Sequence, residues 1–341
     1  MKIAIDLVME NVPANKGSHK ASWLYMWASQ LRNEGHEVKV LHNESWDGYD
    51  KIYLWQNSLV EDFTINCFGG VSDKTVSKLR RLIECDTSKL VSLDVKMADY
   101  GKFVKSRLHN KSMDPSGHLV DWDKVTEVCK GIPVITQRDL KVDHQIIGDS
   151  HSFSVYTKGA SLSRNDGKTL NGAINQGLES FVYPGMKKLT FYFGNIDVRH
   201  HICRLNDGNY KQNIDELMER YAKQLLHLTE NYEIELVDLL PIENESRIIP
   251  NSIGRYKGLQ FTGSHDQRTA AYKYFNERLL NIAQKLGAEI YHHPEHYVNS
   301  LGELCFSVME PKQNVHLSRQ QYRWDLDNDE KRNFQEVEKL F

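Results

Sequence analysis

The chain has 341 residues, of which 40% are hydrophobic and 26% are charged, and its formal net charge at pH 7 is −3. This composition is typical of a folded globular protein and excludes disordered and fibrous classes. The slightly negative charge argues against a protein that coats nucleic acid without specificity, although it is compatible with a local basic face. The length favours about two domains.

The start of the sequence has no features of an export signal. No apolar stretch approaches the roughly 20 residues that a membrane-spanning helix needs. Met1 leads directly into a strand pattern at residues 2–8, without a charged and then apolar leader. We therefore expect a cytoplasmic protein.

The first 140 residues alternate between strand and helix patterns. Apolar runs predict the strands, and apolar residues at helical spacing predict the helices. Strands are expected at 2–8, 38–43, 49–56, 89–95 and 132–137, and helices at 17–37, 71–85 and 122–130. Such a series implies a parallel sheet whose ligands lie beyond the carboxyl ends of the strands.

A second alternating series follows residue 141. It predicts strands at 144–150, 189–198, 233–242 and 288–293, and helices at 213–232 and 266–287. The expected fold class is therefore α/β, with two three-layer domains at 1–140 and 141–320. A charged helix pattern over 321–341 is expected to pack back on the body.

Cysteine and histidine spacing argues against a metal site. The five cysteines are scattered and odd in number, which supports neither a disulfide framework nor a CxxC zinc site. His265, His292, His293 and His296 lie near one another in the second half, yet no cysteine or carboxylate spacing completes a closed site. We expect no metal.

Five segments of the first half resemble one known family. MKIAID, GYDKIYLWQNS, TINCFGG, SKLVSLDV and IPVITQ occur here in the order and at the spacing of the acceptor-side domain of T-even phage DNA β-glucosyltransferases. The resemblance implies a GT-B fold, in which two Rossmann- or flavodoxin-like domains face a central cleft. It also implies transfer from a nucleotide sugar, such as a UDP-sugar, to 5-hydroxymethylcytosine in double-stranded DNA, in the host cytoplasm if a phage encodes the protein.

The same resemblance assigns roles to residues of the first half. Asp94 matches the general base that deprotonates the hydroxymethyl group, and an inverting transfer needs one carboxylate near the acceptor hydroxyl; alternatively, Asp94 caps the next helix. Basic residues outnumber acidic ones by ten to five between residues 70 and 111, as a phosphate-binding track or a solvated helix face would require. The DNA-binding candidates are Gly69, Gly70, Lys74, Lys78, Arg81, Lys102 and Lys105.

The second half lacks the donor-binding residues of that family and resembles the SGNH, or GDSL-like, hydrolase superfamily. The matching segments are IIGDSHS with Ser150, FYFGNIDVRHH with Asn195 and NVHLS with His316. The segment NDGKTLNG offers Gly167 as a further glycine of the site, with Gly159 as the less favoured choice. The implied fold is a flavodoxin-like sandwich.

The residue types fit nucleophilic catalysis. Serine becomes a good nucleophile when a histidine takes its proton, and amide groups of the backbone and of Asn195 can stabilise the oxyanion. The superfamily usually has an aspartate three residues before the histidine, where this chain has Gln313. An amide can orient the imidazole but does not stabilise its cation as a carboxylate does.

A nucleotide-sugar donor would bind in the second half if sugar transfer is the reaction. The candidates for holding it are Gly148, Gly167, Arg199 and His200. An arginine suits a diphosphate or a carboxylate, but Arg199 could equally pair with Asp197 or Asp149.

The favoured prediction is a phage-type transferase that adds a sugar to a hydroxymethylated pyrimidine in DNA. The alternatives are a serine esterase or O-acyltransferase acting on a glycan or a modified base, and a DNA- or glycan-binding module without catalysis. The pivotal residues are Asp94 for the first function, and Ser150 with His316 for the second.

Overall fold

The computed structural model describes residues 1–7, 19–41, 44–55, 73–94, 121–244, 262–309, 315–318 and 321–323. The chain divides into two compact units, Met1–Lys141 with Leu326–Phe341, and Val142–Asp325. Each unit contains a five-stranded sheet whose strands are all parallel. The expectation of two parallel α/β domains is therefore confirmed, while most of the expected helix over 321–341 lies outside the described residues.

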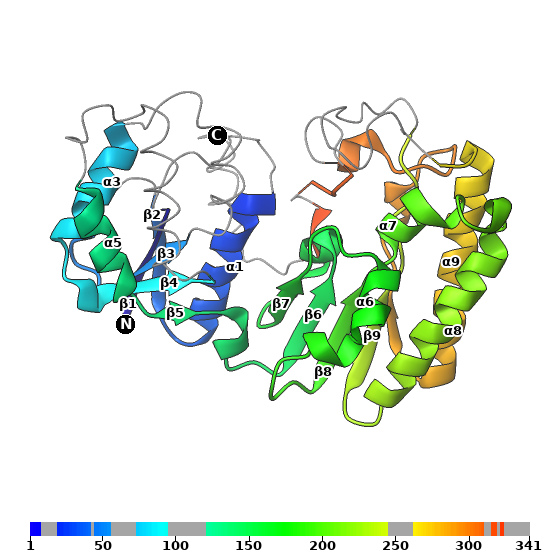
Figure 1. Cartoon of the computed structure of the whole chain (residues 1–341), viewed down its shortest axis with the longest axis horizontal. Coiled ribbons are helices and arrows are strands. Elements are labelled where there is room, and N and C mark those ends of the chain that lie inside the picture. Colours follow the sequence, from blue (N-terminus) through cyan, green and yellow to red (C-terminus); the bar gives the residue numbers. More distant parts are fainter. Residues whose placement is uncertain are drawn as a thin grey trace. The chain divides into compact units, whose positions relative to one another are not determined.

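In the first unit the strand order is β2-β1-β3-β4-β5. The strands are β1 (Lys2–Leu7), β2 (Glu37–Leu41), β3 (Lys51–Trp55), β4 (Leu90–Leu93) and β5 (Val134–Ile135), and the helices are α1 (His19–Asn33), α3 (Asp73–Glu84) and α5 (Trp122–Lys130). The chain moves one way along the sheet from β1 to β2 and the other way from β3 to β5. Right-handed crossovers then place α1 on one face and α3 with α5 on the other, as Figure 1 shows.

The second unit repeats this order as β7-β6-β8-β9-β10. Its strands are β6 (His144–Gly148), β7 (Ser161–Arg164), β8 (Lys188–Tyr192), β9 (Glu233–Val237) and β10 (Glu289–Tyr291), and its helices are α6 (Leu170–Gln176), α7 (Asn195–Asp197), α8 (Tyr210–Leu228) and α9 (His265–Leu286). This is the flavodoxin-like order. Neither β7 nor α6 was predicted from the sequence, and the strand predicted over 189–198 ends six residues earlier, at Tyr192.

One face of the second sheet packs against helices. Leu189 and Phe191 of β8 and Ile234 of β9 join residues of α6, α8 and α9 in a continuous apolar core, and Figure 1 shows α8 and α9 side by side. Helix α9 begins with a capping box between Ser264 and Gln267, which satisfies two amide donors at its first turn. Among the described helices, none is long and apolar enough to span a membrane.

The other face of the same sheet carries a buried polar network. Strand alternation turns Thr190 and Glu235 to this face, opposite Leu189 and Ile234. Glu235 accepts hydrogen bonds from the Thr190 hydroxyl at 2.7 Å and from both terminal nitrogens of Arg323 at 2.9 and 3.0 Å. Arg323 also donates its backbone N–H to Ser154 O at 2.7 Å. The Arg323 guanidinium therefore holds the last described residues of this unit against its sheet.

Arg323→Ala should lower the free energy of unfolding by about 3 kcal/mol, because it leaves Glu235 buried without its cation. The value lies at the lower end of the range for buried pairs, since the Arg323 side chain is 27% exposed. Urea denaturation measures the change. The control is Lys130→Ala, which breaks the exposed Lys130–Glu127 pair and should lower the free energy of unfolding by less than about 1 kcal/mol. An equal loss of stability in the two variants would contradict a stabilising role of the Arg323–Glu235 pair.

Candidate active site

Ser150 follows β6 and Asn195 follows β8, two neighbouring interior strands of the second sheet. Strands β6 and β8 are neighbours, and their pairing ends with Gly148 opposite Tyr192. The chain leaves β6 toward β7 and leaves β8 toward β9, in opposite directions along the sheet. Such a switch point, at the carboxyl ends of parallel strands, is where α/β sheets bind their ligands.

The structure brings Ser150 and His316 into direct contact. His316 Nε2 lies 2.8 Å from Ser150 Oγ, although the two residues are 166 positions apart in the chain. Both residues are partly exposed. When Nε2 carries no proton, the serine hydroxyl donates to it, which is the arrangement that activates a serine nucleophile.

Local structure fixes both partners. Ser150 opens a 3-10 helix, Ser150–Val155, whose first turn is capped by Asp149. The segment with His316 is held by a bridge between Met309 and Leu317 and by a hydrogen bond from Ser318 N to Val308 O at 2.8 Å. Leu317 also belongs to a small buried apolar cluster with Leu240, Tyr297, Leu304, Val308 and Met309.

Asn195 presents a free donor. Its side chain is buried, and its Oδ1 accepts a hydrogen bond from Leu240 N at 3.1 Å. Its Nδ2 meets the distance and angle of a hydrogen bond with no described residue. Burial raises the pKa of the Tyr192 phenol, and Asn195 is near enough to that hydroxyl to lower it in part. The preceding Gly194 has φ +115, and a Cβ there would lie 2.5 Å from Phe275 Cζ, so only glycine makes this turn. A fixed, unpaired N–H in a buried position is suited to stabilising an oxyanion.

The two candidate glycines have different surroundings. A Cβ on Gly148 would lie 2.5 Å from Tyr192 O and 2.8 Å from Ser152 Cβ, so this position needs glycine for the close approach of β8. Gly167 has φ +71 in a turn closed by a hydrogen bond from Lys168 N to Asn165 O at 3.0 Å. Asn165 N in turn donates to Gly148 O at 2.8 Å, which ties the turn to the end of β6. A donor-binding role for these glycines stays a prediction.

Arg199 has a carboxylate partner that the sequence analysis did not name. Its Nε lies 2.5 Å from Glu243 Oε1, and both side chains are buried. The suggested pairing with Asp197 or Asp149 is therefore wrong, because the short helical turn after Asn195 directs the guanidinium toward Glu243. Phosphate binding by Arg199 and by the partly exposed His200 stays a prediction.

Asp197 instead caps a helix. It accepts hydrogen bonds from Leu170 N at 2.6 Å and from Asn171 N at 3.2 Å, at the first turn of α6. Burial raises the pKa of Asp197 to about 7, because the loss of hydration disfavours its charged form.

Asp94 lies at the carboxyl end of β4 in the first unit. Its backbone has φ 66, in the left-handed region, and its Oδ2 accepts a hydrogen bond from Trp27 Nε1 at 2.8 Å. Loss of hydration raises the pKa of this partly buried carboxyl to about 7. Residues 95–120 lie outside the described part of the chain, so the alternative role as a helix cap stays open. A cleft shared with Ser150 also stays a prediction.

For most of the DNA-binding candidates the structure does not describe the side chain. Gly69, Gly70, Lys102 and Lys105 fall outside the described residues, and Lys74 and Lys78 lie on α3 without described side chains. The remaining candidate is Arg81, which donates to Glu44 O at 2.5 Å and has its guanidinium 5.4 Å from the Trp46 ring.

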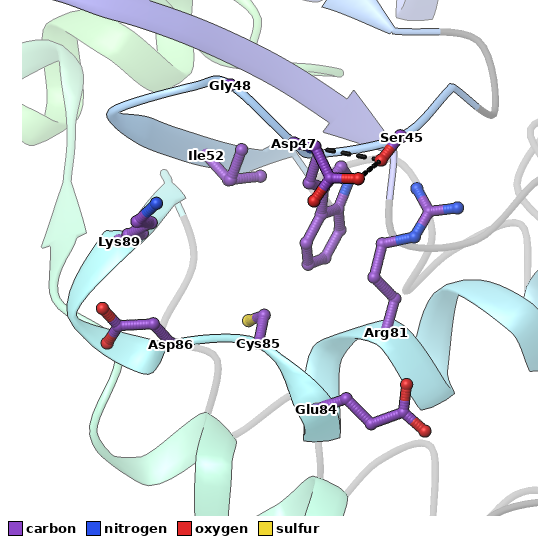
Figure 2. Close-up of a pocket in the computed structure, with 10 residues that line it drawn as sticks. Ser45, Asp47, Gly48, Ile52, Arg81, Glu84, Cys85, Asp86 and Lys89 are labelled. Atoms are coloured by element: carbon purple, nitrogen blue, oxygen red, sulfur yellow. Dashed lines mark hydrogen bonds between the residues drawn. The ribbon is translucent and has the colours of Figure 1, made fainter.

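Arg81 lines a cavity of about 400 Å³ (Figure 2). Ile52 at the start of β3 and Lys89 just before β4 line the same cavity. It therefore lies toward the amino ends of these strands, away from the edge where Asp94 follows β4. DNA binding by Arg81 stays a prediction.

Two site residues, His151 and Tyr192, were missed from the sequence, and His293 was considered only as a metal ligand. Tyr192 OH lies 2.9 Å from His293 Nε2, and His151 Nδ1 lies 2.9 Å from Asp149 Oδ1. Burial is the main reason that the pKa of His293 is lowered to about 3, and the neighbouring His151 adds to the effect, so this ring is neutral. The signal for His151 was its place directly after Ser150; nothing in the spacing pointed to Tyr192.

The suspected histidine cluster forms no metal site within the described residues. His292 Nδ1 lies 2.9 Å from Asp238 Oδ2, and His265 Nε2 lies 2.9 Å from Glu303 Oε1. These histidines thus have separate carboxylate partners.

No protein-family model matches the sequence, and no curated protein matches it significantly. Solved structures do match. One described as a putative platelet activating factor from Streptococcus pneumonia is 13% identical, with 59% of this chain and 82% of that chain covered and a TM-score of 0.38. A GDSL-like lipase from Bacteroides thetaiotaomicron is 16% identical, with 58% and 88% covered and a TM-score of 0.37.

A lipase/acylhydrolase from Enterococcus faecalis is 11% identical, with 58% of this chain and 96% of that chain covered and a TM-score of 0.32. At these identities and TM-scores the likenesses carry no argument about activity. They also give no support to the glucosyltransferase resemblance of the first half.

Asp197→Asn should make the free energy of unfolding depend less steeply on pH. The folded chain keeps the Asp197 proton while the unfolded chain loses it, so this group makes unfolding easier as pH rises from 3.8 to about 7. The slope is at most about 1.4 kcal/mol per pH unit. Urea denaturation across this range measures it.

The control for this experiment is Asp143→Asn, which removes an exposed carboxylate paired with Lys187 and should leave the slope nearly unchanged. If the free energy of unfolding of Asp197→Asn depends on pH as steeply as that of the wild type, Asp197 is ionised in the folded protein.

Proposed function

We propose that the second unit is a serine esterase or O-acyltransferase, with Ser150 as the nucleophile and His316 as its base. The observation that carries this proposal is the 2.8 Å contact between Ser150 Oγ and His316 Nε2. Its place at the switch point of a flavodoxin-like sheet supports the proposal independently, because the contact lies where such folds bind substrates.

The proposed reaction has two halves. Ser150 Oγ attacks the carbonyl carbon of an ester while its proton moves to His316 Nε2, and Asn195 Nδ2 with the Ser150 backbone N–H stabilises the oxyanion. The bond between the acyl carbon and the leaving alcohol then breaks, and His316 returns the proton to that alcohol. Water, or a second alcohol in a transferase, attacks the acyl-enzyme by the same route and releases Ser150.

This chemistry identifies the substrate as an O-acyl ester. A glycan hydroxyl and a modified base are the two acceptors that we consider. Ser150→Ala removes the nucleophile and leaves Asp94 in place, which makes it possible to separate this function from sugar transfer.

We expect a fluorophosphonate probe to label the wild-type protein at Ser150 and to leave Ser150→Ala unlabelled. Asp94→Asn is the matched control: it should label like the wild type, because Asp94 belongs to the other unit. Intact-mass spectrometry with peptide mapping measures both. An unlabelled wild type, or equal labelling of Ser150→Ala, would contradict the proposal.

Asp94 supports a second candidate function, sugar transfer to a hydroxymethylated pyrimidine in DNA. A carboxyl whose pKa is about 7 is poised to accept a proton near neutral pH, and Asp94 follows a parallel strand at its carboxyl end. In this reaction Asp94 deprotonates the hydroxymethyl group of a flipped base, and the oxygen attacks the anomeric carbon of a UDP-sugar as the diphosphate leaves.

The test of this second function uses hydroxymethylcytosine DNA and a panel of UDP-sugars. Sugar transfer predicts a heavier nucleoside after digestion, lost in Asp94→Asn and kept in Ser150→Ala. An unchanged nucleoside mass across the panel would overturn it. A binding module without catalysis predicts instead that neither substitution changes any product and that DNA binding weakens steeply with salt.

A further inference from the structure

A buried acid–histidine pair lies directly beside the proposed serine–histidine dyad. The side chains of His151 and Asp149 are 1% and 0% exposed. The ring of His151 lies 4.8 Å from the ring of His316, measured between centroids. The proposed reaction assigns no step to this pair.

Both ring nitrogens of His151 face oxygen atoms. Nδ1 lies 2.9 Å from Asp149 Oδ1, and Nε2 lies 3.3 Å from the backbone oxygen of Val315. A carboxylate and a peptide carbonyl can only accept hydrogen bonds. Both contacts are therefore hydrogen bonds only when both nitrogens carry protons, and in that form His151 is an imidazolium with Asp149 as its counter-ion.

The other titratable groups around this ring agree with that assignment. Tyr192 presents an edge contact at 6.2 Å between ring centroids, and it is a neutral phenol, since burial raises its pKa further. His293 is neutral because its pKa is lowered. The described titratable groups around the His151 ring are Asp149, Tyr192, His293 and His316. Asp149 is the anion of this group, so it would balance the charge of a protonated His151.

Val315 immediately precedes His316 in the chain. A hydrogen bond to the Val315 carbonyl therefore restrains the backbone that carries the proposed base. Gln313 occupies the place where the SGNH resemblance leads us to expect an aspartate, and an amide does not stabilise an imidazolium as a carboxylate does.

We propose that the Asp149–His151 pair positions His316. His151 donates from Nε2 to the Val315 carbonyl, Asp149 fixes the ring and its charge, and together they hold His316 Nε2 against Ser150 Oγ. This inference rests on the proposed serine chemistry, and it makes His151 a positioning residue that does not touch the substrate.

The protonation state of His151 can be tested without any activity. In protein labelled with ¹⁵N-histidine, we expect NMR to show a doubly protonated ring at pH 7.5 that disappears in His151→Asn and is thereby assigned to His151. Asp149→Asn should convert that ring to the singly protonated form. A singly protonated His151 in the wild type at pH 7.5 would overturn the proposal.

Two substitutions of His151 test positioning. In Gln the amide nitrogen can reach the place of Nε2 and donate to Val315, whereas in Asn it reaches only the place of Nδ1. We expect fluorophosphonate labelling of Ser150 to slow by about 100-fold in His151→Asn, because a small displacement of the base has that effect. His151→Gln should restore most of the rate.

The control is His144→Gln, which replaces a histidine bonded to Thr190 at the opposite end of β6 and should label like the wild type. Wild-type rates in both His151 variants would overturn the positioning role while leaving the serine chemistry intact. An unlabelled wild type would overturn the serine chemistry itself, while the NMR measurement still reports on the pair.

Discussion

The register between β6 and β8 is the constraint on which the candidate site depends. Gly148 pairs with Tyr192, and Asp149 N continues the pairing by donating to Tyr192 O at 3.1 Å. The backbones approach so closely here that a Cβ on Gly148 would collide with that oxygen. The register thus determines that Ser150 and Asn195 leave adjacent strands at the same edge of the sheet.

Burial of polar groups around this edge is matched by specific partners. Arg199 pairs with Glu243, Asp197 with two amides of α6, and His151 with Asp149. Such groups are costly to bury unless they are hydrogen-bonded. Among the described residues, Asn195 Nδ2 and Asp149 Oδ2 are two buried atoms at this edge without a hydrogen-bond partner, and of the two only Asn195 Nδ2 is a donor.

Strong periodicity made the long elements predictable. The helices predicted at 213–232 and 266–287 correspond to Tyr210–Leu228 and His265–Leu286. The four-residue β7 and the seven-residue α6 were missed because so few residues display no clear period. The strand predicted through 198 was too long because Gly194 turns the chain into a helical segment despite the apolar residues that follow.

The candidate site was predictable only in part. Ser150, Asn195 and His316 came from a resemblance, because no spacing rule relates residues that are 166 positions apart. The Glu243 partner of Arg199 and the contact between His151 and Val315 depend on loops that meet only in the folded chain. Charge and residue type could list candidates for Arg199, but they could not choose among several carboxylates.

Activation of Ser150 by His316 is the central claim, and chemical rescue tests it most directly. In His316→Gly, labelling of Ser150 by a fluorophosphonate should fall by about 100-fold or more, because general-base assistance is lost. Added imidazole should restore part of the rate by occupying the vacated space. Labelling of His316→Gly at the wild-type rate, with no response to imidazole, would contradict the account.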